Sequence, residues 1–332
     1  MNELTELVES VFGDAWDATA TGLDTALWAT LEETGLARLT LPEAAGGSGG
    51  TYADAAEVLT AAGRFAARVP LVETDWLAGR LLHTAGLAVP EGPLVAVVAP
   101  GLTVDGDTVS GTLARVPWGR AVAGVVALVG ERVVLVDPSD ARVVEGVNVA
   151  EEFRDTLVLD RARATVSAMP AGGGDEFALR AALGRALLLA GAAHGALSMS
   201  VKYATERVQF GRPIGRLQAV QQSLALAAAE VAAATAASQA AAREVDRNGF
   251  DGAESAVAAA KSRCGDAAGE VARIAHQVHG AIGFTREHEL RLVTTRLWAW
   301  RDEDGAEEIW NDRLGARALD AGPDGLWPLL AG

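Results

Sequence analysis

Cysteine is nearly missing from this chain of 332 residues, which contains a single one, Cys264. One cysteine forms no disulfide within the chain and offers no metal-ligand spacing, so a disulfide scaffold or a zinc module is excluded. Positive charge is also scarce. The formal net charge of −16 argues against nucleic acid or an anionic membrane as a partner, although a local arginine cluster can still bind a phosphorylated cofactor.

The sequence also lacks membrane spans, targeting signals and the common nucleotide motifs. No uninterrupted apolar run reaches the roughly 18 residues of a membrane helix. The N-terminus MNELTELVES is acidic and has no basic signal-peptide region. We find no G-x-G-x-x-G after a strand, no Walker motif, no H-E-x-x-H and no G-x-S-x-G. The glycine cluster at 46–50 is interpreted as a flexible turn. We expect a cytoplasmic protein without membrane association.

Hydrophobic periodicity divides the chain into three parts. Residues 1–90 show helical spacing, with an interruption at 69–74 and a further helix expected over 75–85. Residues 91–170 contain short β-branched runs separated by turns and predict a small β-domain. Residues 171–332 are alanine-rich and predict a four-helix bundle with additional helices. The expected bundle helices cover 177–206, 216–247 and 251–279, followed by helices starting at 286 and 303. The predicted fold class is α+β, mostly α.

One expected interhelical turn, within 203–222, carries unusually useful side chains. Gly211, Pro213 and Gly215 should end one helix near residue 209 and let the next begin near 216. Arg207 offers a guanidinium fork for phosphate, and Phe210 offers an aromatic face. Gln209 and Arg212 add amide and guanidinium donors. An ordinary helix corner with solvated arginines is the alternative interpretation.

A second turn is expected at the end of the helix that includes Gln277. Gly280 and Gly283 stop that helix and let backbone amides come close to a ligand. His279 and His288 lie in the same run, but no third ligand accompanies them, so we predict no metal site.

The two turns together resemble the acyl-CoA dehydrogenase family of flavoproteins. The first resembles its Arg-x-x-Phe-Gly…Gln motif, and the second its Q-x-x-G-G-x-G motif, with Ala281 in place of the second glycine. The loop P-E-x-x-G-G-x-G of the family is also matched, by Pro42 and the residues that follow it. The resemblance implies that FAD, held mainly by a neighbouring subunit, is contacted by Arg207, Gln209, Phe210, Gln218, Gln277, Gly280 and Ala281.

Two features of the family are missing or altered. The T-E-x-x-x-G-S-D-type loop that cradles the flavin ring has no room between Pro100 and Gly111. Trp118 lies near a flavin-flanking position of the family, but we interpret it as a core residue. The glutamate base that removes the α-proton of the acyl-CoA falls, by an ungapped count, on Asp304. The alternative interpretation of 302–308 is a solvated acidic turn at a helix N-terminus. The other family location of the base falls near Ala181, which is not acidic.

The resemblance therefore suggests the smaller, base-deficient subunit of a heterotetrameric acyl-CoA dehydrogenase, of a type associated with steroid catabolism. The larger subunit would supply the base and most of the flavin-ring pocket, and an electron-transfer flavoprotein would accept the electrons. Two alternatives stay open: a self-sufficient homo-oligomeric enzyme with Asp304 as its base, and a helical scaffold without flavin. The sequence does not identify the acyl group or the partner.

Overall fold

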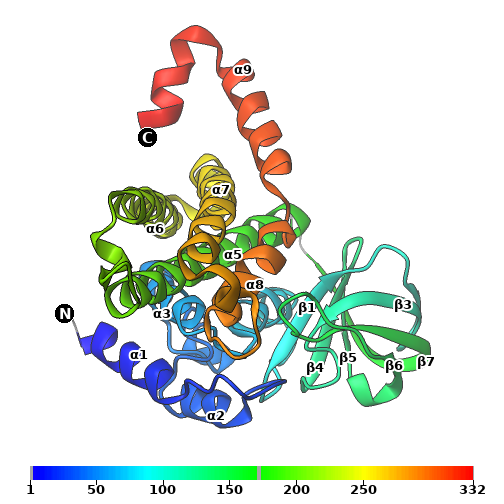
Figure 1. Cartoon of the computed structure of the whole chain (residues 1–332). Coiled ribbons are helices and arrows are strands. Elements are labelled where there is room, and N and C mark those ends of the chain that lie inside the picture. The colour runs from blue at the N-terminus through cyan, green and yellow to red at the C-terminus, as the bar shows by residue number, and fades with distance from the viewer. Residues whose placement is uncertain (1–2, 170–172, 332) are drawn as a thin grey trace. The chain divides into compact units, whose positions relative to one another are not determined.

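The computed structural model describes residues 3–169 and 173–331, with side chains as far as residue 327 (Figure 1). The chain forms two compact units. One contains residues 1–9 and 56–66 and the chain from Ala182 onward, and the other contains 10–55 and 67–181. The predicted α+β, mostly α fold class is confirmed. The three-part division at residues 90 and 170 stays a prediction.

The first helices are α1 (Glu3–Asp14), α2 (Thr25–Glu33), α3 (Tyr52–Arg64), the π-helix η2 (Val72–Gly79) and α4 (Arg80–Thr84), with a 3-10 turn η1 at Glu43–Ala45. Asp24 caps α2, because its Oδ1 accepts from the backbone N–H of Leu27 at 3.0 Å. The expected interruption at 69–74 is wrong in its second half, where η2 already begins. All eight residues of η2 are buried, so the segment lacks the one-sided period that marks a surface helix.

The β-domain is one seven-stranded sheet in the order β1-β4-β5-β7-β3-β2, with β6 also paired to β7. Its strands are β1 (Leu94–Val98), β2 (Thr103–Asp105), β3 (Thr108–Pro117), β4 (Gly124–Val129), β5 (Arg132–Val136), β6 (Ala141–Val144) and β7 (Arg154–Ala168), with a 3-10 turn η3 at Pro138–Asp140. Only four residues, 99–102, separate β1 from β2, and the absence of a flavin-cradling loop between Pro100 and Gly111 stays a prediction. Trp118 is 4 % exposed and packs edge-on against Phe153, as expected of a core residue.

The helical bundle contains α5 (Gly173–Glu206), α6 (Gln218–Gly252), α7 (Glu254–His279), α8 (Leu290–Asp302) and α9 (Glu307–Ala331), which bends at Gly322 (Figure 1). Within the unit that holds most of the bundle, α3 and α5 cross closely at glycines. A Cβ on Gly63 would lie 2.1 Å from the carbonyl oxygen of Leu188, and one on Gly191 would lie 2.0 Å from that of Thr60. Any larger residue at these positions would push the two backbones apart.

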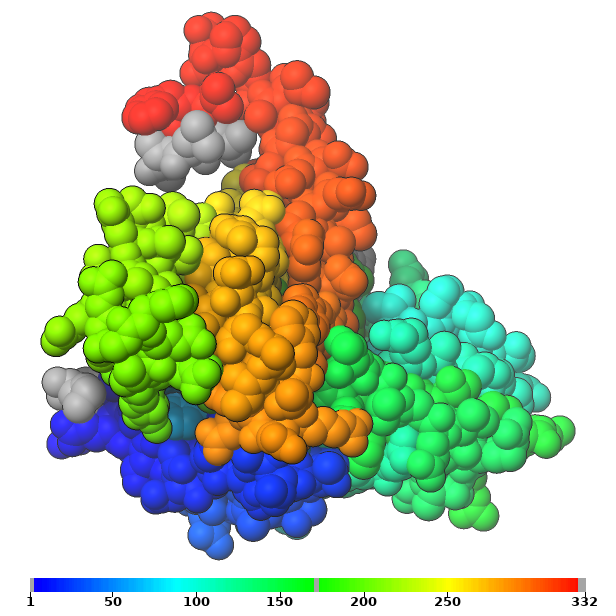
Figure 2. Space-filling view, viewed as in Figure 1, coloured from blue at the N-terminus to red at the C-terminus, as the bar shows by residue number. Residues whose placement is uncertain are grey.

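Two of the described helices, α5 and α6, are long and apolar enough to cross a membrane by length and composition. In α5 the most apolar stretch is 78% buried inside the protein, and in α6 it is 28% buried. The outer face of α6 is therefore an exposed alanine surface next to α7 (Figure 2).

A buried carboxylate ties η2 to the loop that contains the glycine cluster. Asp75 accepts hydrogen bonds from the N–H and the hydroxyl of Thr40, both at 3.0 Å, and from the N–H of Leu41 at 3.1 Å. Burial raises the pKa of Asp75 to about 6, although these donors act in the opposite direction. The loop is thus fixed by a carboxylate that is costly to ionise.

We expect Asp75→Asn to change how stability depends on pH. Because the pKa of Asp75 is raised in the folded chain, its contribution is full below about pH 4 and is lost as the pH rises through about 6. The difference in unfolding free energy between wild type and variant should therefore shrink by about 3 kcal/mol over this window. Urea denaturation at several pH values measures it.

The exposed Asp137 provides a control, because its contribution to stability should depend on pH in the opposite direction to that of Asp75. Hydrogen bonds from Ser139 lower the pKa of Asp137, so its contribution to stability is lost as the pH falls. A difference between wild type and Asp75→Asn that is constant from pH 4 to 7 would contradict the buried ionisation.

Candidate functional site

The first predicted turn is a small β-hairpin. α5 ends at Glu206, β8 (Val208–Gln209) pairs with β9 (Arg212–Pro213), and the 3-10 turn η4 (Ile214–Arg216) leads into α6. The chain reverses at Phe210 and Gly211, which have φ values of 50° and 74°. Positive φ at both central residues is the geometry of a type I′ turn, whose twist matches that of the paired strands. The hairpin holds the Phe210 ring outward, where it is 87% exposed.

The polar side chains of this hairpin are available to a ligand. Arg207, Gln209 and Gln218 lie at the surface, and their side chains bond to no residue that the structure describes. Arg207 is held only through its backbone, which donates to the carbonyl of Tyr203 and accepts from the N–H of Ile214, both at 2.8 Å. A fixed backbone with a free guanidinium is suited to binding phosphate.

The second predicted turn begins where α7 ends. Gly280 has a φ of 65°, and the 3-10 turn η5 (Gly280–Phe284) follows. A Cβ on Gly280 would meet no atom within 4 Å, so the space in front of this residue is open. Gln277 and Ala281 are exposed beside it. Glycine is required here by the backbone conformation and leaves the peptide groups accessible.

Three rings bring the two turns together. Tyr203, four residues before Arg207, stacks on His279 with ring centroids 4.4 Å apart. His288 packs edge-on against both rings, at 4.7 Å from His279 and 5.9 Å from Tyr203. The turns are more than 70 residues apart in the sequence, and their bases are joined by this cluster. Tyr203 was not among the predicted site residues, and only its position one helical turn before Arg207 could have indicated it.

A second aromatic stack lies on the same part of α7. The ring of His276 is stacked between Phe284, at 4.1 Å, and Trp298, at 5.1 Å. Burial lowers the pKa of His276, and neither of its ring nitrogens has a hydrogen-bond partner among the described residues. Histidine is used here as a planar apolar ring. In the part of the chain that the structure describes, no three His, Cys, Asp or Glu side chains are grouped to hold a metal ion.

The residues of the two turns fit one end of a dinucleotide such as FAD. Unpaired Arg207, the exposed amides of Gln209, Gln218 and Gln277, and the open backbone at Gly280 suit a pyrophosphate and an adenosine. The short connection at 99–102 offers no corresponding cradle for a flavin ring. The fit is therefore partial, and the assignment of these residues to FAD stays a prediction.

Asp304 is bound to a buried arginine. It lies in the turn between α8 and α9 with a φ of 59°. The expected helix start at 303 is wrong, because α9 begins at Glu307, and the alternative of an acidic helix N-terminus holds only for Glu307 and Glu308. Arg185, on α5 and 5 % exposed, donates from Nε to Asp304 Oδ2 at 2.9 Å, and its Nη2 lies 3.3 Å from Glu303. One guanidinium therefore binds both carboxylates.

A buried lysine fixes the backbone of the same turn. Lys261, on α7 and 1% exposed, donates to the carbonyls of Arg301 at 2.9 Å and Gly305 at 2.5 Å. Burial lowers the pKa of Lys261 to about 8, and the nearby Asp304 acts in the opposite direction. The indole N–H of Trp310 donates to the carbonyl of Asp304 at 3.0 Å. Helices α5, α7 and α9 thus hold this turn in one conformation.

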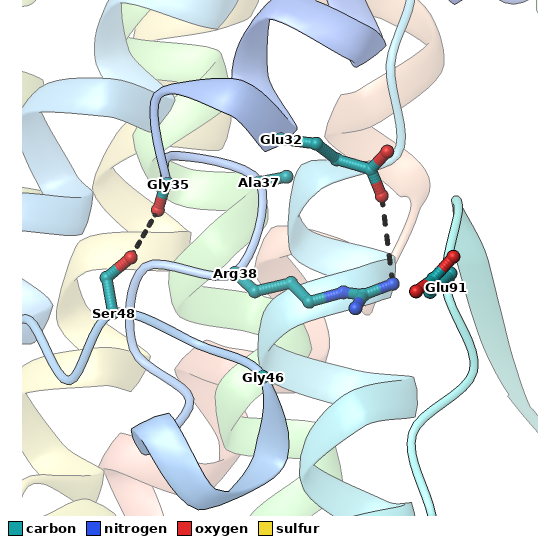
Figure 3. Close-up of a pocket in the computed structure, with 7 residues that line it drawn as sticks. All are labelled: Glu32, Gly35, Ala37, Arg38, Gly46, Ser48 and Glu91. Carbon is teal, nitrogen blue, oxygen red and sulfur yellow. Dashed lines mark hydrogen bonds and ion pairs between the residues drawn. The ribbon is translucent and has the colours of Figure 1, made fainter.

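A polar pocket of about 280 Å³ in the other unit is not a phosphate site (Figure 3). Arg38 extends between Glu32 and Glu91, and its Nη2 donates to the carbonyls of Pro90 and Gly92 at 2.7 and 2.9 Å. The backbone amides of the adjoining glycine cluster are already hydrogen-bonded, because every N–H from 46 to 50 donates to a backbone carbonyl of residues 38–43. A loop without free amides cannot cradle an anion.

Comparison with known proteins identifies relatives over most of the chain. Models of the N-terminal and C-terminal domains of acyl-CoA dehydrogenase match residues 5–87 and 159–319. The acyl-CoA dehydrogenase IpdE2 of Mycolicibacterium smegmatis is 32% identical over 290 residues, 83% of this chain and 82% of the relative. Among solved structures, a variant of the steroid ACAD Tcur3481–Tcur3483 is 27% identical, with a TM-score of 0.83 over 96% of this chain and 97% of that one. A chain of the ChsE4–ChsE5 complex of Mycobacterium tuberculosis is 23% identical and superposes with a TM-score of 0.84. The superposition covers 97% of this chain and 99% of that chain, which shows a shared fold.

Replacing Arg185 should destabilise the bundle. Arg185→Met removes the guanidinium that binds both Asp304 and Glu303, and we expect a loss of about 2–3 kcal/mol in unfolding free energy, below the range for fully buried pairs because both carboxylates keep some exposure. Arg247→Met is the matched control, since Arg247 is 67% exposed in its pair with Glu244 and should matter by less than about 0.5 kcal/mol. Chemical denaturation measures both. Equal effects would show that the buried pair has no special role.

Proposed function

Because the chain belongs to the acyl-CoA dehydrogenase family, we propose that it is the base-deficient subunit of a heteromeric acyl-CoA dehydrogenase. In this proposal it completes the FAD site of a larger subunit. The larger subunit supplies the catalytic carboxylate and the pocket for the flavin ring.

The observation that carries the proposal is the ion pair of Asp304 with Arg185. A general base must have a lone pair free to reach the α-proton of the acyl thioester. The Arg185 guanidinium that hydrogen-bonds to Asp304 occupies a carboxylate oxygen that would otherwise take the proton. The same arginine also binds Glu303, so neither acidic residue of this turn is free to act.

The short connection between β1 and β2 also supports the proposal that the larger subunit supplies the flavin-ring pocket. The four residues between β1 and β2 leave no loop to cover a flavin ring. The family's cofactor accepts a hydride from the substrate when bound. The residues of this chain are suited to holding the other end of that cofactor, because Arg207 would neutralise the pyrophosphate while Gln218 and Gln277 would hydrogen-bond the adenosine end.

Exposed apolar surface on the bundle supports a partner subunit. On α6, Leu226 is 59% exposed among exposed alanines, and Phe210 and Phe284 project from the two turns at 87% and 69%. Exposed apolar patches mark surfaces that a second protein covers, and aromatic side chains are enriched in such interfaces. A subunit seated here would lie against both cofactor-facing turns.

For the substrate we propose a CoA thioester with a bulky, steroid-derived acyl group. The support is the likeness to the steroid ACAD Tcur3481–Tcur3483 over nearly the whole chain. We further propose an electron-transfer flavoprotein as electron acceptor and a cytoplasmic location, which follow from the family resemblance and the sequence.

The proposal predicts that the chain purified alone carries no stoichiometric FAD and has no dehydrogenase activity. Its visible absorption spectrum, recorded together with its native mass, tests this directly. Flavin absorbance and turnover should arise on co-expression with a larger acyl-CoA dehydrogenase subunit that contains the glutamate base. A yellow homo-oligomer that oxidises an acyl-CoA would instead establish the self-sufficient enzyme.

Two variants of the complex separate the roles of Asp304 and Arg207. Asp304→Asn should leave turnover within about twofold, whereas loss of a working base costs about a hundredfold or more. Arg207→Ala should weaken FAD binding about tenfold or more, because a charge-assisted hydrogen bond to phosphate is lost. Arg247→Ala, another exposed arginine of the bundle, is the control. Unchanged flavin content in Arg207→Ala would favour a scaffold without a flavin role.

A further inference from the structure

We propose that Tyr203, His279 and His288 form a ring clamp that sets the spacing of the two cofactor-facing turns and opens when its histidines are protonated. This inference rests on the proposed function, in which both turns contact FAD. The clamp residues would be positioning residues, because they act through the turns they carry.

Each ring of the clamp comes from a different element. Tyr203 belongs to the last turn and a half of α5, His279 is the last residue of α7, and His288 lies just before α8. The three rings touch one another, at centroid distances of 4.4, 4.7 and 5.9 Å. Tyr203 is connected to Arg207 by a backbone hydrogen bond of 2.8 Å, and His279 directly precedes Gly280. Movement within the clamp therefore moves the turns relative to each other.

Hydrogen bonds assign the role of one ring nitrogen in each histidine. His279 is 4 % exposed, and its Nδ1 lies 2.8 Å from the carbonyl of Ala275, so Nδ1 carries the proton. Its Nε2 is buried and has no partner among the described residues. His288 Nδ1 accepts from the backbone N–H of Leu290 at 3.1 Å, at the start of α8, so this nitrogen carries no proton. The two rings thus use opposite tautomers.

Acid disturbs both arrangements. Burial lowers the pKa of His279, and the charges of His288 and His276 lower it further, whereas the carbonyl of Ala275 acts in the opposite direction. A proton on His279 would place a charge on a buried nitrogen without an acceptor. A proton on His288 Nδ1 would remove the acceptor that caps α8. Either event weakens the packing of the three rings.

Other titratable and charged groups lie around the clamp. α7 contributes His276, the segment before α8 contributes His288, and α5 contributes the phenol of Tyr203. The charged side chains of the segment that carries His288, namely Arg286, Glu287, Glu289 and Arg291, are exposed or partly exposed, as are Arg207 after α5 and Arg273 on α7. Among the described residues, no carboxylate contributes to the lowered pKa of His279. A proton on His279 would therefore have no carboxylate to offset its burial.

Ring substitutions in the FAD-loaded complex test the positioning role. At pH 7.5, Tyr203→Ala should raise the dissociation constant of FAD about tenfold, the scale of a lost aromatic pair. Tyr203→Phe keeps the ring and should stay within about twofold of wild type. Titration of the apo complex with FAD, followed by flavin fluorescence, measures both. Wild-type FAD affinity in Tyr203→Ala would overturn the clamp.

A double variant tests the protonation. In His279→Phe/His288→Asn the ring on Tyr203 is kept and an amide oxygen can cap α8, but neither position can be protonated. For the wild-type complex we expect FAD to bind about tenfold more weakly at pH 5.5 than at pH 7.5. The double variant should bind FAD equally at both. Equal acid sensitivity in the two proteins would overturn the proposal.

Hydrogen exchange on the chain alone separates a failed clamp from a failed function. After correction for intrinsic rates, peptides covering 203–216 and 277–290 should exchange faster at pH 5.5 than at 7.5 in wild type, but not in the double variant. If the wild-type complex binds no FAD at pH 7.5, the proposed function fails. The exchange rates of wild type and double variant then still test the clamp by themselves. Identical exchange in both proteins would reject the clamp whatever the complex binds.

Discussion

A buried guanidinium in an alanine-rich bundle must find a carboxylate, and this requirement shapes the C-terminal part of the protein. Arg185 is 5% exposed and takes both Glu303 and Asp304 as partners. Because unpaired charge is so costly inside a protein, the turn between α8 and α9 has little freedom once Arg185 is buried. Lys261 completes the restraint by binding two carbonyls of the same segment. The family resemblance places a catalytic base in this turn, but here its side chains and carbonyls connect α5, α7 and the α8–α9 segment.

The same bundle positions the proposed cofactor contacts. Alanine and glycine let the long helices approach closely, and the ends of α5 and α7 meet at Tyr203 and His279. Hairpin β8–β9 and turn η5 then project from neighbouring helix ends, and the side chains of Arg207, Gln209 and Gln218 bond to no residue that the structure describes. The two turns offer side chains for a cofactor, whereas the acidic residues Glu303 and Asp304 are bound within the chain by Arg185. The chain thus has cofactor-binding groups but no free carboxylate in this turn to serve as the base. This is the physical basis for proposing a partner.

Much of the fold can be predicted from periodicity and propensity. The alanine-rich helices, the β-branched runs and the glycine-marked turns are predicted to within a few residues, because these signals are local. The first half of η2 is not predicted, since a segment buried on every side has no amphipathic period. The predicted start of α9 is four residues too early, because acidic residues favour a helix N-terminus in general but here Glu303 and Asp304 are drawn to Arg185.

The sequence by itself determined most helices and strands, the family and the two turns, because motifs and hydrophobic periodicity depend on residues that are close together in the chain. Only the tertiary structure decided what the acidic turn does, since the group that binds Asp304 lies 119 residues away on another helix. Tertiary packing likewise joined Tyr203 to His279, because helix ends meet through close backbone approach that no local pattern encodes.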